Sequence, residues 1–279
     1  MKKQFRTAML STACMLVVAV MSLTGVTYAW FTAGTDATVN GMSVTVTTTA
    51  GGIEVREKMT AMTTPEEGGE ATETITYTPW ANQLDLNVNR TGLDALSSKD
   101  GINFFDIEFD PASYEQAKIS AINRDSNLNV IVKNIQVQYT GTDANLEITL
   151  DGSEITQRVG SNDIYKAARV AIIIGNTSYI MGAEAGDSAQ AFVQASGDTF
   201  IKVNQAVEGY TATTTTVAAN AIPVTLPKAV LDENGTTTCT PVDITIVIWL
   251  EGQDSNCVNG NAGGSFDVAL KFGKPVAGN

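Results

Sequence analysis

The chain has 279 residues, with 30 acidic residues against 17 basic ones and a formal net charge of −13 at pH 7. An acidic surface repels nucleic acid and anionic lipid headgroups, so neither is an expected partner. Histidine is absent from the sequence, which excludes a Ser–His–Asp or Cys–His catalytic group and a zinc hydrolase of the HExxH type. We expect no cofactor and no enzymatic activity, although paired carboxylates or a Ser–Lys pair are chemistries that need no histidine.

The N-terminus has the layout of a secretory signal peptide. A basic segment at 1–6 precedes an uncharged apolar run at 8–23, and Gly25 ends that run. The pattern predicts a signal over 1–29 and a mature domain over 30–279, with the cleavage junction formed by Thr27, Tyr28, Ala29 and Trp30. A retained membrane anchor is the alternative, because the apolar run is long. Lipidation at Cys14 is disfavoured, since Ser11 stands where a lipobox has leucine.

The residues around this junction carry a family resemblance. They read GVTYAWFT at 25–32 and TVNG at 38–41, followed by a Thr/Val-rich segment. This stretch resembles the start of the TasA/camelysin family of secreted Gram-positive biofilm-matrix proteins, which have a SipW-type signal peptide. The resemblance implies a β-sandwich subunit that assembles into extracellular fibres. Segments 96–104 and 248–257 also resemble recurring stretches of Gram-positive surface proteins with the same kind of signal.

Alternating apolar and polar residues predict strands along the mature chain, each with one face turned inward. The inward sets begin at Met42, Leu84, Phe105, Ile135, Leu146 and Phe266. Two runs, Val170–Ile174 and Ile244–Leu250, are apolar on both faces and predict central strands. The second run and Phe266–Phe272 are expected to form a hairpin with a long loop.

These elements predict an all-β fold, an antiparallel β-sandwich of jelly-roll-like type with one or two short helices and long loops. The helix candidates begin at Asp110-Pro111 and at Ser188–Ala195. The mature chain is expected to be a single domain, and an insertion around 160–235 is left open.

Two kinds of candidate site have ordinary alternatives. Cys239 and Cys257 are the two cysteines after the signal, which suggests a disulfide in a secreted chain. Because a long strand separates them, two free thiols are the alternative. Oxygen-bearing side chains at Asp85, Asn87, Asn89 and Asp254 are weak calcium candidates. A solvated strand face and an ordinary turn are the favoured interpretation of them.

The segment Trp30–Thr49 is the main functional candidate. It is a terminal strand with an aromatic tip, and its proposed assembly residues are Trp30, Phe31, Met42, Val44 and Val46. A terminal strand can leave its own domain and pair with the open sheet edge of the next subunit. Such a contact is heterologous and need not close, so a filament can result. Pairing of the strand within its own domain is the alternative.

These features together favour a secreted structural subunit of an extracellular matrix or surface fibre. The expected partners are copies of the chain itself, in a homopolymer, or related matrix proteins. No stable membrane association is expected after signal cleavage. The alternative function is a cell-surface adhesin or carbohydrate-binding module, and a secreted hydrolase is a third interpretation that the lack of histidine disfavours.

Overall fold

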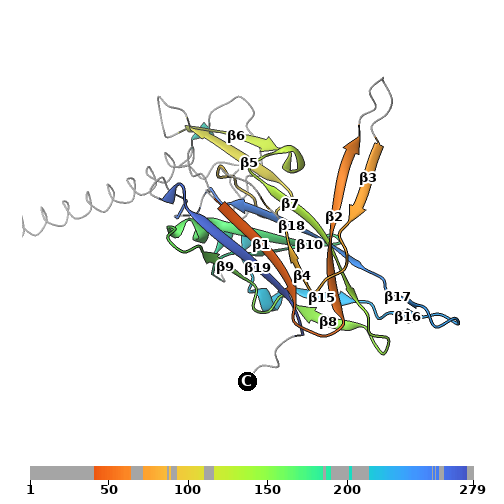
Figure 1. Cartoon of the computed structure of the whole chain (residues 1–279). Helices are drawn as coiled ribbons and strands as arrows, with labels where there is room; N and C mark the ends of the chain where they lie inside the picture. The colour runs from red at the N-terminus through yellow and green to blue at the C-terminus, as the bar shows by residue number, and fades with distance from the viewer. Residues whose placement is uncertain are drawn as a thin grey trace, which may run out of the picture.

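Two packed β-sheets form the body of the protein (Figure 1). The computed structural model describes residues 41–63, 72–86, 88, 93–109, 116–184, 187–189, 201–202, 214–252, 254, 256–257 and 261–274. The larger sheet has the order β11 (Thr177–Met181), β10 (Ala168–Ile174), β18 (Val242–Leu250), β7 (Ile131–Tyr139), β2 (Ile53–Thr63) and β3 (Thr72–Tyr77). The smaller sheet has the order β4 (Gln83–Asp85), β1 (Gly41–Thr48), β19 (Ser265–Phe272) and β9 (Glu154–Gln157). The predicted all-β class is therefore confirmed.

Short strands and 3₁₀ turns surround the two sheets. The strands are β5 (Phe104–Phe109), β6 (Gln116–Ile122), β8 (Leu146–Thr149), β12 (Ser188–Ala189), β13 (Ile201–Lys202), β14 (Thr214–Thr215), β15 (Pro223–Leu226), β16 (Val230–Leu231) and β17 (Thr237–Thr238). The 3₁₀ turns are η1 (Arg124–Ser126), η2 (Asp163–Ala167) and η3 (Ala219–Ala221). Among the described residues, no helix is long and apolar enough to cross a membrane.

The main core lies between the two sheets and follows the predicted alternation. In β19, Phe266, Val268 and Leu270 are at most 1 % exposed, while the residues between them are half-buried. Val44 and Val46 of β1 meet the same core. One face of each of these strands therefore packs inward, as their sequence pattern predicts.

The larger sheet is covered on its other face as well. Ile246 and Ile248 of β18 face the main core, whereas Val247 and Trp249 face a second, smaller core. The neighbouring β10 divides in the same way, with Ala171 in the smaller core. Both strands lie inside the sheet, so the prediction of two central strands is confirmed.

The expected hairpin of Ile244–Leu250 with Phe266–Phe272 is wrong. These segments are β18 and β19, and they lie in different sheets. The connection crosses from one sheet to the other, and β19 pairs with β9 and, in parallel, with β1. The pattern of apolar residues sets which face of each strand is buried, but a long connection leaves its partner open.

Two further expectations are refined. The helix candidate at 188–195 begins instead as strand β12, and the candidate at Asp110-Pro111 lies outside the described residues. Strands β10 and β11 belong to the larger sheet, and Ile222 and Val224 belong to the main core. The single domain with an insertion around 160–235 stays a prediction.

We expect Leu270→Ala to lower the free energy of unfolding by about 2–5 kcal/mol, because it opens a cavity between the two sheets. Lys271→Ala, on the solvent side of the same strand, is the matched control and should change it by less than about 1 kcal/mol. Urea unfolding followed by tryptophan fluorescence measures both. Equal effects of the two substitutions would contradict the assignment of the strand faces.

Candidate functional site

Strand β1 occupies a slot between two other strands of the smaller sheet. It runs parallel to β19 over its whole length, from Gly41 opposite Ser265 to Thr48 opposite Phe272. On its other edge it pairs antiparallel with β4, over Thr45–Thr47. Val44 and Val46 are completely buried. The strand is thus held by backbone hydrogen bonds on both edges and by two apolar side chains in the core.

A short turn joins β1 to the rest of the domain. The turn covers 49–52 and leads directly into β2, which belongs to the other sheet. Gly52 has φ of +80°, a conformation that glycine adopts without steric cost. A Cβ at Gly51 would meet no atom within 4 Å. A Cβ at Gly52 would instead lie 3.1 Å from Thr140 Oγ1, so the open space is at Gly51.

The structure tests the predicted assembly residues unevenly. Val44 and Val46 lie together on the buried face of β1. Met42 is on the same strand, and its side chain lies outside the described residues, as do Trp30, Phe31 and the cleavage junction Thr27, Tyr28 and Ala29. In this single chain, β1 pairs within its own domain.

Segments 96–104 and 248–257, which are far apart in the sequence, meet at the end of β18. The Leu96 backbone N–H donates to the Leu250 carbonyl at 3.0 Å, and the Gly252 N–H donates to the Leu96 carbonyl at 2.8 Å. The ring of Phe104 meets that of Trp249 edge-on, with centroids 5.3 Å apart. Segments 96–104 and 248–257 therefore form one structural unit, in which the first covers the smaller core.

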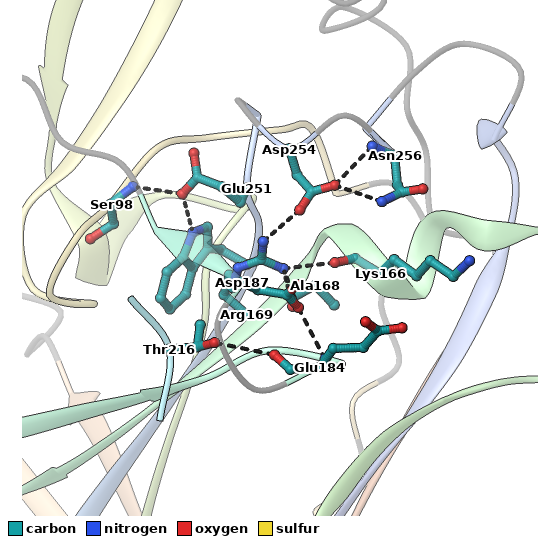
Figure 2. Close-up of polar contacts among 11 residues, drawn as sticks. Ser98, Lys166, Ala168, Arg169, Glu184, Asp187, Thr216, Glu251, Asp254 and Asn256 are labelled. Atoms are coloured by element: carbon teal, nitrogen blue, oxygen red, sulfur yellow. Dashed lines mark hydrogen bonds and ion pairs between the residues drawn. The ribbon is translucent and has the colours of Figure 1, made fainter. Parts of the chain in front are cut away.

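A buried polar cluster adjoins this unit (Figure 2). Arg169 of β10 is fully buried, and its Nη1 donates to the Lys166 and Ala168 carbonyls at 2.7 and 3.0 Å. Its Nη2 donates to Asp254 Oδ2 at 2.5 Å, and Asp187 Oδ2 lies 3.8 Å from Nη1. The guanidinium is thereby bonded to carboxylate and carbonyl oxygens, as a charge removed from water requires.

Glu251 completes the cluster. It is fully buried, and its Oε2 accepts from the Trp249 indole N–H and the Ser98 backbone N–H, each at 3.3 Å. Sequence reasoning missed both Arg169 and Glu251 as buried charges. The available signal was a lone arginine inside an apolar strand and an acid directly after an apolar run, which are unusual in buried strands.

The calcium candidates are not brought together. Asp85 lies on β4 of the smaller sheet, whereas Asp254 follows β18 and bonds Arg169. Asn87 and Asn89 lie outside the described residues. Within the described part of the chain, no group of three or more His, Cys, Asp or Glu side chains is placed to hold a metal ion.

The two cysteines are free thiols in the structure, so they form no disulfide there. Cys239 is half-buried, and Cys257 is buried in the main core. Burial raises the pKa of the Cys257 thiol to about 12, with Glu251 and Asp254 adding to the rise and Arg169 opposing it. A thiol with this pKa is neutral and a poor nucleophile at physiological pH.

The described tryptophans offer no free aromatic platform. Trp249 is fully buried. Trp80 and Tyr77 are both covered by Arg56, whose guanidinium carbon lies 4.2 and 4.0 Å from the two ring centroids. Stacking on a sugar ring would first require Arg56 to leave, at the cost of its cation–π contacts.

No protein-family model matches the chain, no curated protein matches its sequence, and no solved structure matches its fold. The resemblance of the N-terminal segment to the TasA/camelysin family therefore stays a prediction.

We expect N-ethylmaleimide at pH 8 to modify Cys239 but not Cys257 in the folded mature chain, and both in urea, as read by intact mass. The raised pKa also has a linkage consequence. Above pH 9.0 the unfolded chain loses the proton of Cys257 while the folded chain keeps it. The free energy of unfolding therefore falls as pH rises from 9.0 toward 12. Cys239→Ser is the control and should leave the folded chain unmodified. Rapid native labelling of Cys257 would contradict its burial.

We expect Gly101→Ala to destabilise the unit of segments 96–104 and 248–257. Gly101 has φ of +65°, and an added Cβ would lie 2.3 Å from that of Ala171. Strain and overpacking together should cost about 2–5 kcal/mol. Gly235→Ala is the matched control, since it has φ of +79° with open space around it, and only the strain of about 1 kcal/mol applies. Thermal unfolding of the two variants checks the difference, and equal melting temperatures would contradict the close contact.

Proposed function

We propose that the protein is a secreted structural subunit of an extracellular matrix or surface fibre, and that subunits assemble by exchanging β1. The observation that carries this proposal is the slot between β19 and β4. It receives a terminal strand through backbone hydrogen bonds along both edges and through two buried valines. Strand addition uses the same two elements, backbone bonds for affinity and alternate side chains for fit.

Exchange costs little contact energy, because the same contacts form between chains as within one chain. A β1 strand from a neighbour can make the same hydrogen bonds and bury the same valines as the chain's own strand. The principal cost is the loss of the intramolecular connection, which domain-swapped proteins meet through a hinge loop. The turn supplies a candidate hinge, since Gly51 has open space around it and Gly52 adopts its positive φ without steric cost. Because each subunit can give its strand to one neighbour and receive a strand from another, the assembly need not close.

The alternative function, a surface adhesin or carbohydrate-binding module, has less support. Sugar-binding sheets depend on free aromatic faces, and Arg56 stacks on the rings of Tyr77 and Trp80. Trp249 is buried. The structural function therefore remains the preferred proposal.

A disulfide that locks β1 in its own domain tests exchange directly. Thr45 lies opposite Asp85 in the antiparallel pair. The neighbouring Leu86 N–H bonds to the Val44 carbonyl, so Thr45 and Asp85 form a non-hydrogen-bonded pair, in which Cα atoms are about 4.5 Å apart and a disulfide fits. We expect the oxidised variant T45C/D85C of chain 30–279 to form no filaments in electron microscopy. Reduction should restore filaments at the rate of the parent chain.

The double variant and the single variant Thr45→Cys both also carry Cys239→Ser. The single variant controls for the new thiol and should form filaments under oxidising and reducing conditions alike. Filaments from the fully oxidised double variant would contradict exchange. A parent chain that folds but forms no filaments would contradict self-assembly and favour the binding module. Deletion of 30–49 is a weaker test, because it also removes Val44 and Val46 from the core.

A further inference from the structure

A hairpin arm of β16 and β17 projects from one end of the protein (Figure 1). Val230 and Leu231 are each 59 % exposed, which is unusual for two adjacent aliphatic residues in an ordered strand. The turn that follows carries two exposed acids, Asp232 and Glu233. Asp232 fixes this turn by accepting from the N–H groups of Asn234 and Thr236, at 2.9 and 2.7 Å. The arm thus presents an aliphatic pair beside a carboxylate tip.

A groove of about 630 Å³ lies elsewhere on the surface, between β2, the start of β7 and η1. Its volume falls in the range of about 300–1,000 Å³ that is typical of binding pockets. We name it the basic groove, since its lining holds three basic residues against two acidic ones, in a chain with a net charge of −13. The apolar and basic residues that line it are Lys58, Met59, Met62, Arg124, Val132 and Lys133.

The cations of the basic groove differ in how firmly they are paired. Lys133 bonds Glu57 at 2.9 Å, and Arg124 bonds Asp125 at 2.8 Å. Lys58 lies 3.8 Å from Asp243, whose side chain is 64 % exposed. That separation is longer than a hydrogen bond. Lys58 is therefore the cation of the groove with most to gain from an incoming carboxylate.

The arm and the basic groove lie at opposite ends of β7. The root of the arm is tied to the chain just after β7, because the Ala229 N–H donates to the Gly141 carbonyl at 2.8 Å. The groove is lined by the other end of the strand, at Val132 and Lys133. β7 has nine residues, which at about 3.3 Å each separates its ends by roughly 25–30 Å. The arm therefore points away from the groove of its own chain.

We propose that the arm of one copy docks into the basic groove of a second copy. The chemistry is complementary on both counts. Leu231 meets Met62 and Val132, which share one face of the sheet with Lys58 because side chains alternate along a strand. The acidic tip meets Lys58. The contact joins two different surfaces, so it is heterologous and extends from copy to copy. It rests on the proposed self-assembly of the chain, but it uses a surface separate from β1.

The test uses the oxidised T45C/D85C chain, in which strand exchange is blocked, and measures self-association by sedimentation velocity at low salt. We expect concentration-dependent dimers and larger species. Glu233→Lys and Lys58→Glu should each weaken this association at least tenfold, and the double variant should restore it, because the charges are exchanged together. Leu231→Ser should weaken it through the apolar contact. Leu231 is exposed, so loss of folding does not confuse the result, and circular dichroism verifies each variant.

Glu154→Lys is the matched control, because it makes the same charge change on β9 of the smaller sheet and should leave association unchanged. A locked chain that stays monomeric at high concentration overturns the docking proposal, even where the unlocked chain forms filaments. Equal weakening of association by Glu233→Lys and Glu154→Lys also overturns it, because the effect would then come from the net charge of the chain and not from a contact at Glu233. Association of the locked chain with rescue by the charge exchange supports docking, even where strand exchange fails.

Discussion

The parallel pairing of β1 with β19 is the constraint on which the domain depends. It joins the first and last strands of the described sandwich along eight residue pairs. Because these strands are separated by more than two hundred residues of sequence, the pairing closes a very long loop and cannot form until β19 is present. During synthesis, β1 emerges before the other described strands, and β19, which forms one side of its slot, emerges after them. A neighbour's strand can therefore compete for the slot before the chain's own strand is in place.

In the proposed exchange, the smaller sheet must keep its structure while no strand fills the slot, and packing against the larger sheet supports it. β18 is covered on both faces, by the main core and by the smaller core around Trp249. The cluster of Arg169, Glu251 and Asp254 fixes the loop that leaves β18 toward β19. A buried ion pair adds little net stability relative to apolar packing, but its loss is costly, because it leaves an uncompensated charge. Such a cluster favours one arrangement of the crossing loop over its competitors.

Much of the fold could be predicted from the sequence, but the pairing of its strands could not. Alternation in Phe266, Val268 and Leu270 gave the buried face, because side chains on a strand point to opposite sides. The alternation does not indicate which strand β19 pairs with, and so the expected hairpin with β18 was wrong. The pairing of β1 was also not predicted, since distant parallel strands are not joined by a short turn whose sequence would indicate the pairing.

The candidate site divides in the same way. The sequence indicated a terminal strand and two buried valines, because local pattern and position along the chain were enough. It did not bring Leu96 to Gly252 or place Arg169 beside Asp254, since these contacts depend on how the sheets stack. Asp254 illustrates the difference. As a loop acid beside Ser and Asn it suggested calcium, whereas its place in the fold makes it the partner of a buried guanidinium.

The net charge of −13 affects the two proposed self-contacts differently. Like charge on every copy opposes approach over a Debye length, about 8 Å at physiological ionic strength, so salt lowers the barrier to any encounter. Strand exchange then depends on backbone bonds and buried valines, which salt does not screen. Docking of the arm depends partly on an exposed ion pair with Lys58, which salt does screen. Rising ionic strength therefore favours strand exchange over docking of the arm. The acidic surface thus makes the relative strength of the two proposed contacts depend on salt.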